Sequence, residues 1–137
     1  AAVMNADMLA EEADFFSIGT NDLTGYTMAV DRGNANVAYL YSALSPAVLR
    51  AIKHVVKAAR AASVPVGMCG EAAADKRLIP LLISFGLNEF SVSPVSTLRT
   101  RSEIARWSKA DSDALAERIM KLKTESEIAA ALEEATA

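Results

Sequence analysis

The stretch DFFSIGTND, residues 14–22, changes from apolar to polar within a few positions. Its first part is a short run of large apolar side chains, which is typical of a buried strand and predicts one over 14–20. Its second part is the polar triplet Thr20-Asn21-Asp22. The stretch therefore predicts a strand whose carboxyl end carries polar side chains.

Two further segments have the same character. VPVGMC (64–69) and EFSVS (89–93) are short apolar runs, and we expect a strand over each of them. Polar or small residues again occupy the carboxyl ends: Cys69, Gly70 and Glu71 after the second strand, and Ser91 and Ser93 in the third.

Helices are expected between and after these strands. The strongest signal is Ser45-Pro46, a capping residue followed by proline at the first helical position, at the start of a helix that reaches about Ala62. This helix has an apolar stripe opposite a basic face. The other helices are expected over 3–12, 75–85, 97–107, 111–123 and 125–135, with mixed loop and short helix over 21–44.

Two helix ends have specific signals. Gly86 follows the 75–85 segment and is expected to end that helix as its C-cap. Thr124 and Glu127 have the spacing of a capping box at the start of the last helix.

Strands that alternate with helices predict an α/β fold with a parallel sheet and right-handed crossovers. Three parallel strands buried on both faces do not close a domain, so we expect further strands beside them. Left alone, they would expose two sheet edges and an apolar sheet face. In closed eight-stranded barrels the active-site residues lie where strands end and loops begin, which is where the polar residues of this chain occur.

The composition of the chain excludes several classes of function. The chain has 137 residues, 52% of them hydrophobic, which is enough for the core of one domain. A net charge of −3 argues against binding nucleic acid or an anionic membrane. No apolar run of about 18 residues could span a bilayer. One cysteine excludes an internal disulfide and suits a reducing cytoplasm, where we expect the protein.

Asn21 and Asp22 are the first candidates for a site. A carboxylate beside an amide, at a strand's carboxyl end, offers one oxygen ligand for Mg²⁺ and one donor for a phosphate. The alternative is that one of these side chains only caps the following short helix.

Arg32 is the second candidate, within Asp31-Arg32-Gly33-Asn34. Arginine binds phosphate or carboxylate through two parallel hydrogen bonds. The alternative is a turn in which Asp31 and Arg32 form a solvated pair. The residues alone leave both readings open.

Cys69 is the third candidate. A thiol at the end of a buried strand, with Gly67 and Gly70 close by, can approach a ligand as a nucleophile or as a proton donor. The alternative is a buried cysteine that acts as a small apolar side chain. The single histidine, His54, is expected on the wet face of the 46–62 helix, so a Cys-His hydrolase is disfavoured.

Four segments together resemble one family: FFSIGTNDLTGYTMAVDRGN (15–34), SPAVLRAIKHVV (45–56), GMCGE (67–71) and GLNEFSVSPVS (86–96). Their order and spacing resemble the C-terminal portion of Enzyme I, the phosphoenolpyruvate-protein phosphotransferase of bacterial sugar uptake. The resemblance is strong to about residue 107 and looser beyond it. Phosphoenolpyruvate synthase and pyruvate phosphate dikinase share the TND and CGE elements but differ around the arginine segment.

The resemblance implies that residues 1–137 are the C-terminal part of a phosphoenolpyruvate-binding (β/α)8 TIM barrel, incomplete in this chain, with a helical tail at about 108–137. It implies a cytoplasmic homodimer that passes a phosphoryl group from phosphoenolpyruvate to a histidine on a separate N-terminal domain, and then to the phosphocarrier HPr. Carried over to this sequence, Asp22 would bind Mg²⁺ and Asn21 the substrate phosphate. Arg32 would neutralise phosphate charge, and Cys69 would protonate the enolate carbon as the general acid.

The chain begins without Met inside an expected helix, so we expect it to be a piece of a longer protein. The family's second metal carboxylate, its upstream arginines and its histidine domain have no counterpart among these residues. We therefore expect weak metal binding and no turnover by this chain alone. A stand-alone dimerisation or regulatory remnant, or a fragment of a related synthase or dikinase, are the alternative interpretations.

Overall fold

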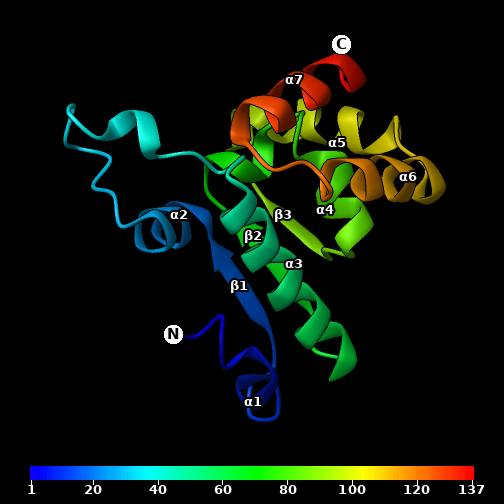
Figure 1. Cartoon of the computed structure of the whole chain (residues 1–137). Helices are drawn as coiled ribbons and strands as arrows, with labels where there is room; N and C mark the ends of the chain where they lie inside the picture. The colour runs from blue at the N-terminus through cyan, green and yellow to red at the C-terminus, as the bar shows by residue number, and fades with distance from the viewer.

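Three parallel strands form the sheet of this α/β structure, a computed structural model that describes residues 1–137 (Figure 1). They are β1 (Phe16–Gly19), β2 (Val66–Cys69) and β3 (Glu89–Ser91), in the order β1-β2-β3. The three predicted strands are confirmed, although each is shorter than expected. Gly19 pairs with Cys69, and Cys69 pairs with Ser91, so the three carboxyl ends lie level at one edge of the sheet.

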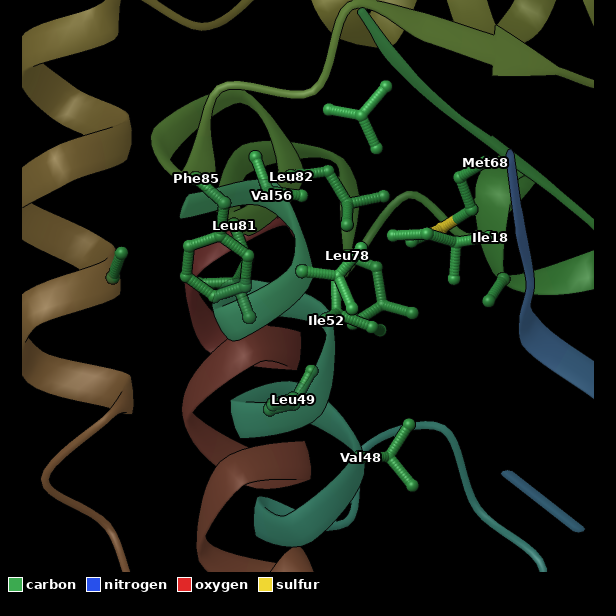
Figure 2. Close-up of a cluster of buried hydrophobic side chains, with 14 of the residues drawn as sticks. Ile18, Val48, Leu49, Ile52, Val56, Met68, Leu78, Leu81, Leu82 and Phe85 are labelled. Carbon is green, nitrogen blue, oxygen red and sulfur yellow. The ribbon is translucent and has the colours of Figure 1, made fainter. Parts of the chain in front are cut away.

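Helices α3 (Pro46–Ala61) and α4 (Ile79–Phe85) cover one face of this sheet (Figure 1). Figure 2 shows the side chains that fill the space between these two helices and the sheet, with Ile18 and Met68 of the strands beside leucines of α4. The labelled core residues are buried: Ile18, Val48, Leu49, Ile52, Val56, Met68, Leu78, Leu81, Leu82 and Phe85. Burying this much apolar surface is the main driving force for the fold.

Helix α3 begins and ends almost where its sequence pattern predicts. The Ser45 hydroxyl accepts a 3.3 Å hydrogen bond from the Ala47 amide, and Pro46 occupies the first turn. Leu49, Ile52 and Val56 are buried, whereas the basic residues of the opposite face, His54 among them, are exposed.

Helix α4 begins later than predicted, at Ile79 rather than at Asp75. The Asp75 side chain accepts a 2.9 Å hydrogen bond from the Arg77 amide and so forms a turn, preceded by the 3₁₀ helix η2 (Glu71–Ala74). Pro80 lacks an amide hydrogen and fits only the first turn of a helix. Gly86 ends α4 with a φ of 94°, as its predicted role requires.

The second face of the sheet is not the apolar surface that we expected. Burial alternates along β2, with Val66 and Met68 buried and Gly67 and Cys69 half-buried. The residues that face away from the α3 and α4 core are small or polar: Ser17, Gly67, Cys69, Glu89 and Ser91. Exposed apolar surface lies instead beside the edge strand β1, where helix α1 (Ala6–Ala10) and the residues around Phe15 line a cavity of about 280 Å³.

The last part of the chain is helical, as predicted, in α5 (Thr97–Ala105), α6 (Lys109–Ile119) and α7 (Glu125–Ala135). The capping box at Thr124 and Glu127 is present. Helix α6 packs closely on α4, and its residues Leu115 and Ile119 belong to the main core. No helix in the chain combines the length and the apolar character needed to cross a membrane.

Candidate functional site

Helix α2 (Thr20–Met28) begins directly where β1 ends, with no intervening loop. Gly19 is its N-cap and no side chain caps the helix. Asn21 and Asp22 therefore lie inside the first helical turn, so the alternative reading of these residues as caps is wrong. This position places both side chains at the carboxyl edge of the sheet.

A buried hydrogen bond joins the start of α2 to the end of β2. The Thr20 hydroxyl donates to the main-chain oxygen of Cys69 at 2.9 Å, and Thr20 is only 1% exposed. Gly70 follows with φ 96° and ψ −179°, a conformation essentially restricted to glycine. A Cβ at Gly70 would also collide with the Thr20 hydroxyl. The two strand ends can approach this closely because residue 70 has no side chain.

Asn21, Asp22 and Arg32 line one cavity of about 460 Å³. Arg32 enters it from the segment that follows α2, next to Val30 and Asp31. An Asp31 carboxylate oxygen accepts a 2.8 Å hydrogen bond from the Gly33 amide, so the predicted turn is present. Arg32 does not pair with Asp31, and its guanidinium has no carboxylate within 4.0 Å. The cavity therefore contains an exposed cation together with a carboxylate and an amide.

Cys69 lies at the same edge of the sheet but does not line this cavity. Its side chain is half-buried, and the thiol donates to the main-chain oxygen of Ile18 at 3.7 Å. The structure thus brings three of the four predicted site residues into one cavity and leaves the fourth on the neighbouring strand.

Tyr41 also belongs to this site, and the sequence did not point to it. Its hydroxyl donates to the main-chain oxygen of Asn21 at 3.0 Å, with Asn21 Oδ1 as a second acceptor at 3.4 Å. Tyr41 and Asn21 line both the first cavity and a second one of about 270 Å³. Since 20 residues separate them, no local sequence signal could have paired them.

An ion pair borders the second cavity. The Arg77 guanidinium donates to both carboxylate oxygens of Asp75, at 3.0 Å to Oδ1 and at 2.7 Å to Oδ2. Burial opposes ionisation of Asp75, but the hydrogen bonds from Arg77 outweigh it and hold the pKa of this carboxyl below its usual value. The pKa of Arg77 is raised, chiefly by the same hydrogen bonds. Both groups are therefore charged over the whole neutral range.

The donor set for a metal ion is small. No group of three or more His, Cys, Asp and Glu side chains in the chain could hold a metal ion. Asp22 offers one exposed carboxylate at the cavity. Because Mg²⁺ is commonly bound through one or two carboxylates, with water and phosphate oxygens as its other ligands, this set suits one edge of a magnesium site.

The chain is similar to known proteins over most of its length. Residues 1–109 match the family described as PEP-utilising enzyme, PEP-binding domain. The chain is 52% identical over 120 residues to the phosphoenolpyruvate-protein phosphotransferase of Streptococcus equinus, covering 88% of this chain and 21% of that protein. It is 48% identical over 129 residues to that of Bacillus subtilis, covering 94% and 23%. It is 49% identical over 137 residues to that of Enterococcus faecalis, covering 99% and 24%.

All three relatives are named phosphoenolpyruvate-protein phosphotransferase, which confirms the resemblance drawn from the four sequence segments. The chain spans only about a quarter or less of the length of these three proteins. Since residues 1–109 match the PEP-binding domain of this family, the chain belongs to the PEP-utilising enzymes.

Proposed function

We propose that this chain forms part of the phosphoenolpyruvate- and Mg²⁺-binding face of a phosphoenolpyruvate-protein phosphotransferase built on a (β/α)8 barrel. The observation that carries the proposal is the shared cavity of Asn21, Asp22 and Arg32 at the carboxyl edge of a parallel sheet. Active sites of barrel enzymes lie at this edge. The relatives named as phosphotransferases support this reaction rather than that of a synthase or dikinase.

Each side chain in the cavity has a role that its chemistry supports. The Arg32 guanidinium has no internal carboxylate partner and can bind phosphate oxygens through two parallel hydrogen bonds. The Asn21 amide can donate to the same phosphate, and Asp22 would hold Mg²⁺. Phosphoryl transfer depends mainly on such positioning and charge neutralisation.

Cys69 would complete the reaction. When the phosphoryl group leaves for the acceptor histidine, the electron pair of the broken P–O bond remains on the substrate as an enolate. The Cys69 thiol would give its proton to the enolate carbon, forming pyruvate and a thiolate that water reprotonates. The thiol donates to Ile18 in this structure, so it must turn from that carbonyl to reach a substrate.

The chain alone should not turn over phosphoenolpyruvate. Its only histidine, His54, is exposed on α3 and is not among the residues that line the cavity, so it is not placed to accept the phosphoryl group. The acceptor histidine, the second metal carboxylate and the route to HPr would come from other parts of the enzyme. We also propose that the enzyme is a cytoplasmic homodimer. Further strands of the barrel would pair with the two outer strands of this sheet, β1 and β3.

A chimaera tests this proposal. Residues 1–137 would replace the corresponding segment of the Enterococcus faecalis relative, whose match covers 99% of this chain. We expect the chimaera to phosphorylate HPr from phosphoenolpyruvate with Mg²⁺. Arg32→Ala should raise the KM for phosphoenolpyruvate by about tenfold to a hundredfold, because charge-assisted hydrogen bonds to phosphate are lost.

The matched control is Arg50→Ala, since Arg50 is exposed on α3 and does not line the cavity. It should leave the KM for phosphoenolpyruvate unchanged. Asp22→Asn should instead raise the Mg²⁺ concentration needed for half-maximal rate. Equal KM values for Arg32→Ala and Arg50→Ala, in a chimaera that is active, would contradict the proposed role of the cavity.

A further inference from the structure

We propose that Tyr41 is a positioning residue: it orients the Asn21 side chain so that the amide nitrogen donates into the cavity, toward a phosphate group. The inference rests on the proposed function and adds a residue to that site. The Tyr41 hydroxyl makes two contacts with Asn21, at 3.0 Å to its main-chain oxygen and at 3.4 Å to its Oδ1.

The surroundings of Asn21 decide which end of its amide is free. Oδ1 is turned toward Tyr41, and it also lies 3.7 Å from the position that a Cβ would take on Gly70. The amide nitrogen makes no hydrogen bond to any protein acceptor, although Asn21 is half-buried. Nδ2 therefore keeps its two donors for a ligand, and a phosphate offers the matching acceptors.

Tyr41 also connects two parts of the site. It lies in the C-terminal part of the segment between α2 and α3. This segment extends away from the sheet before it returns (Figure 1). Arg32 lies near the beginning of the same segment. Because Tyr41, Asn21 and Arg32 line the same cavity, the Tyr41 hydroxyl ties this segment to the first turn of α2 at the place where a phosphate would bind.

The inference can be tested on the chain itself by NMR of the Asn21 side-chain amide, with inorganic phosphate as the probe. Tyr41→Phe removes only the hydroxyl. We expect it to shift the Asn21 Nδ2 resonances and to weaken phosphate binding by about fivefold, the effect of one hydrogen bond. The matched control is Tyr39→Phe on the same segment, since Tyr39 is 78% exposed and its hydroxyl has no hydrogen-bond partner. It should change neither measurement.

A double-mutant cycle separates positioning from simple anchoring of the segment. In an Asn21→Ala background the main-chain oxygen at residue 21 still accepts from Tyr41, but the side-chain amide is gone. Adding Tyr41→Phe to Asn21→Ala should then weaken phosphate binding by less than about twofold. A full fivefold further loss would mean that Tyr41 acts through the segment alone, which overturns the proposal.

Two other results would also overturn it. One is an Asn21 amide signal that Tyr41→Phe leaves unmoved. The other is an amide that responds to Mg²⁺ rather than phosphate, because Oδ1 would then face the cavity. Failure of the proposed function looks different. In that case Tyr41→Phe still moves the Asn21 signals, whereas Arg32→Ala leaves the KM of the active chimaera unchanged.

Discussion

The Thr20 hydroxyl donates a 2.9 Å hydrogen bond to the main-chain oxygen of Cys69, across 49 residues of sequence. The bond connects the start of α2 to the end of β2 at the edge where the candidate site lies. Asn21 and Asp22 follow Thr20 directly, and Gly70 follows Cys69 directly. The relative placement of the two halves of the site therefore depends on this contact.

Replacing Thr20 with valine tests how much this contact contributes to stability. Valine keeps the shape of the side chain but cannot donate, so Thr20→Val should lower the free energy of unfolding by about 1–2 kcal/mol. Urea denaturation followed by circular dichroism measures the change. Thr27→Val is the matched control, since Thr27 is exposed on the same helix, and it should cost less than about 0.5 kcal/mol. Equal effects of the two substitutions would show that the Thr20 bond contributes nothing.

Gly70→Ala should be more damaging than Thr20→Val. The φ of 96° and the collision with the Thr20 hydroxyl both disfavour a Cβ at this position. We expect a loss of about 2–4 kcal/mol in the free energy of unfolding. Gly19→Ala serves as the control, because its φ is −82° and its Cβ would meet nothing closer than 3.8 Å. If Gly70→Ala were as stable as Gly19→Ala, the backbone at residue 70 would have to differ from the one described.

Gly25→Ala should stabilise the chain. Gly25 lies inside α2 without a positive φ, and a Cβ there would meet its nearest neighbour, the Val30 oxygen, at 3.4 Å. Alanine loses less backbone entropy on folding into a helix, so we expect a gain of about 0.5–1 kcal/mol. A melting temperature above that of the unmodified chain would be the readout. A lower one would show that Val30 or Tyr41 cannot accommodate the added methyl group.

The Asp75–Arg77 pair predicts a specific loss of stability in acid. The Asp75 carboxyl is partly buried, which raises its pKa, but hydrogen bonds from Arg77 bring the pKa below the ordinary 3.8. A carboxyl with a lower pKa in the folded chain stabilises it above the unfolded-state value, and this contribution is lost as the pH falls through the folded-state value. The free energy of unfolding should therefore decrease as the pH falls below about 4.

Asp75→Asn removes this contribution and should cost about 1–2 kcal/mol at pH 7. The effect of Asp75→Asn on the free energy of unfolding should shrink when urea denaturation is repeated at about pH 3, roughly one unit below the ordinary pKa of an aspartate. Asp14→Asn, at an exposed carboxylate without an ion pair, is the control at both pH values. A cost of Asp75→Asn that is the same at both pH values would contradict the assignment.

The elements predicted best from the sequence have local signals at their ends. Helix α3 has the Ser45 cap, Pro46 in its first turn and an apolar stripe, and it lies within a residue of its expected bounds. Helix α7 has a complete capping box, and Gly86 ends α4 in the left-handed conformation. Each of these signals acts over a few residues, so the local sequence is enough to predict where the helix begins or ends.

The elements predicted less well depend on distant contacts or on competing local turns. Helix α2 begins at Thr20 without a side-chain cap, where a bond to a residue of another strand holds its first turn. Helix α4 begins later than predicted because the Asp75 side chain forms a turn with the Arg77 amide. The prediction that the second face of the sheet is apolar was wrong. A short apolar run does not show which of its alternate positions face the helices and which face away from them.

The sequence by itself determined the strands, most helices, the family resemblance and the four side chains proposed for the site. Only the tertiary structure decided that Asn21, Asp22 and Arg32 share a cavity, that Cys69 turns to Ile18, and that Tyr41 contacts Asn21. The physical reason is range. Caps, proline positions and hydrophobic periodicity act between near neighbours, whereas strand register and loop packing bring together residues between 20 and 51 positions apart.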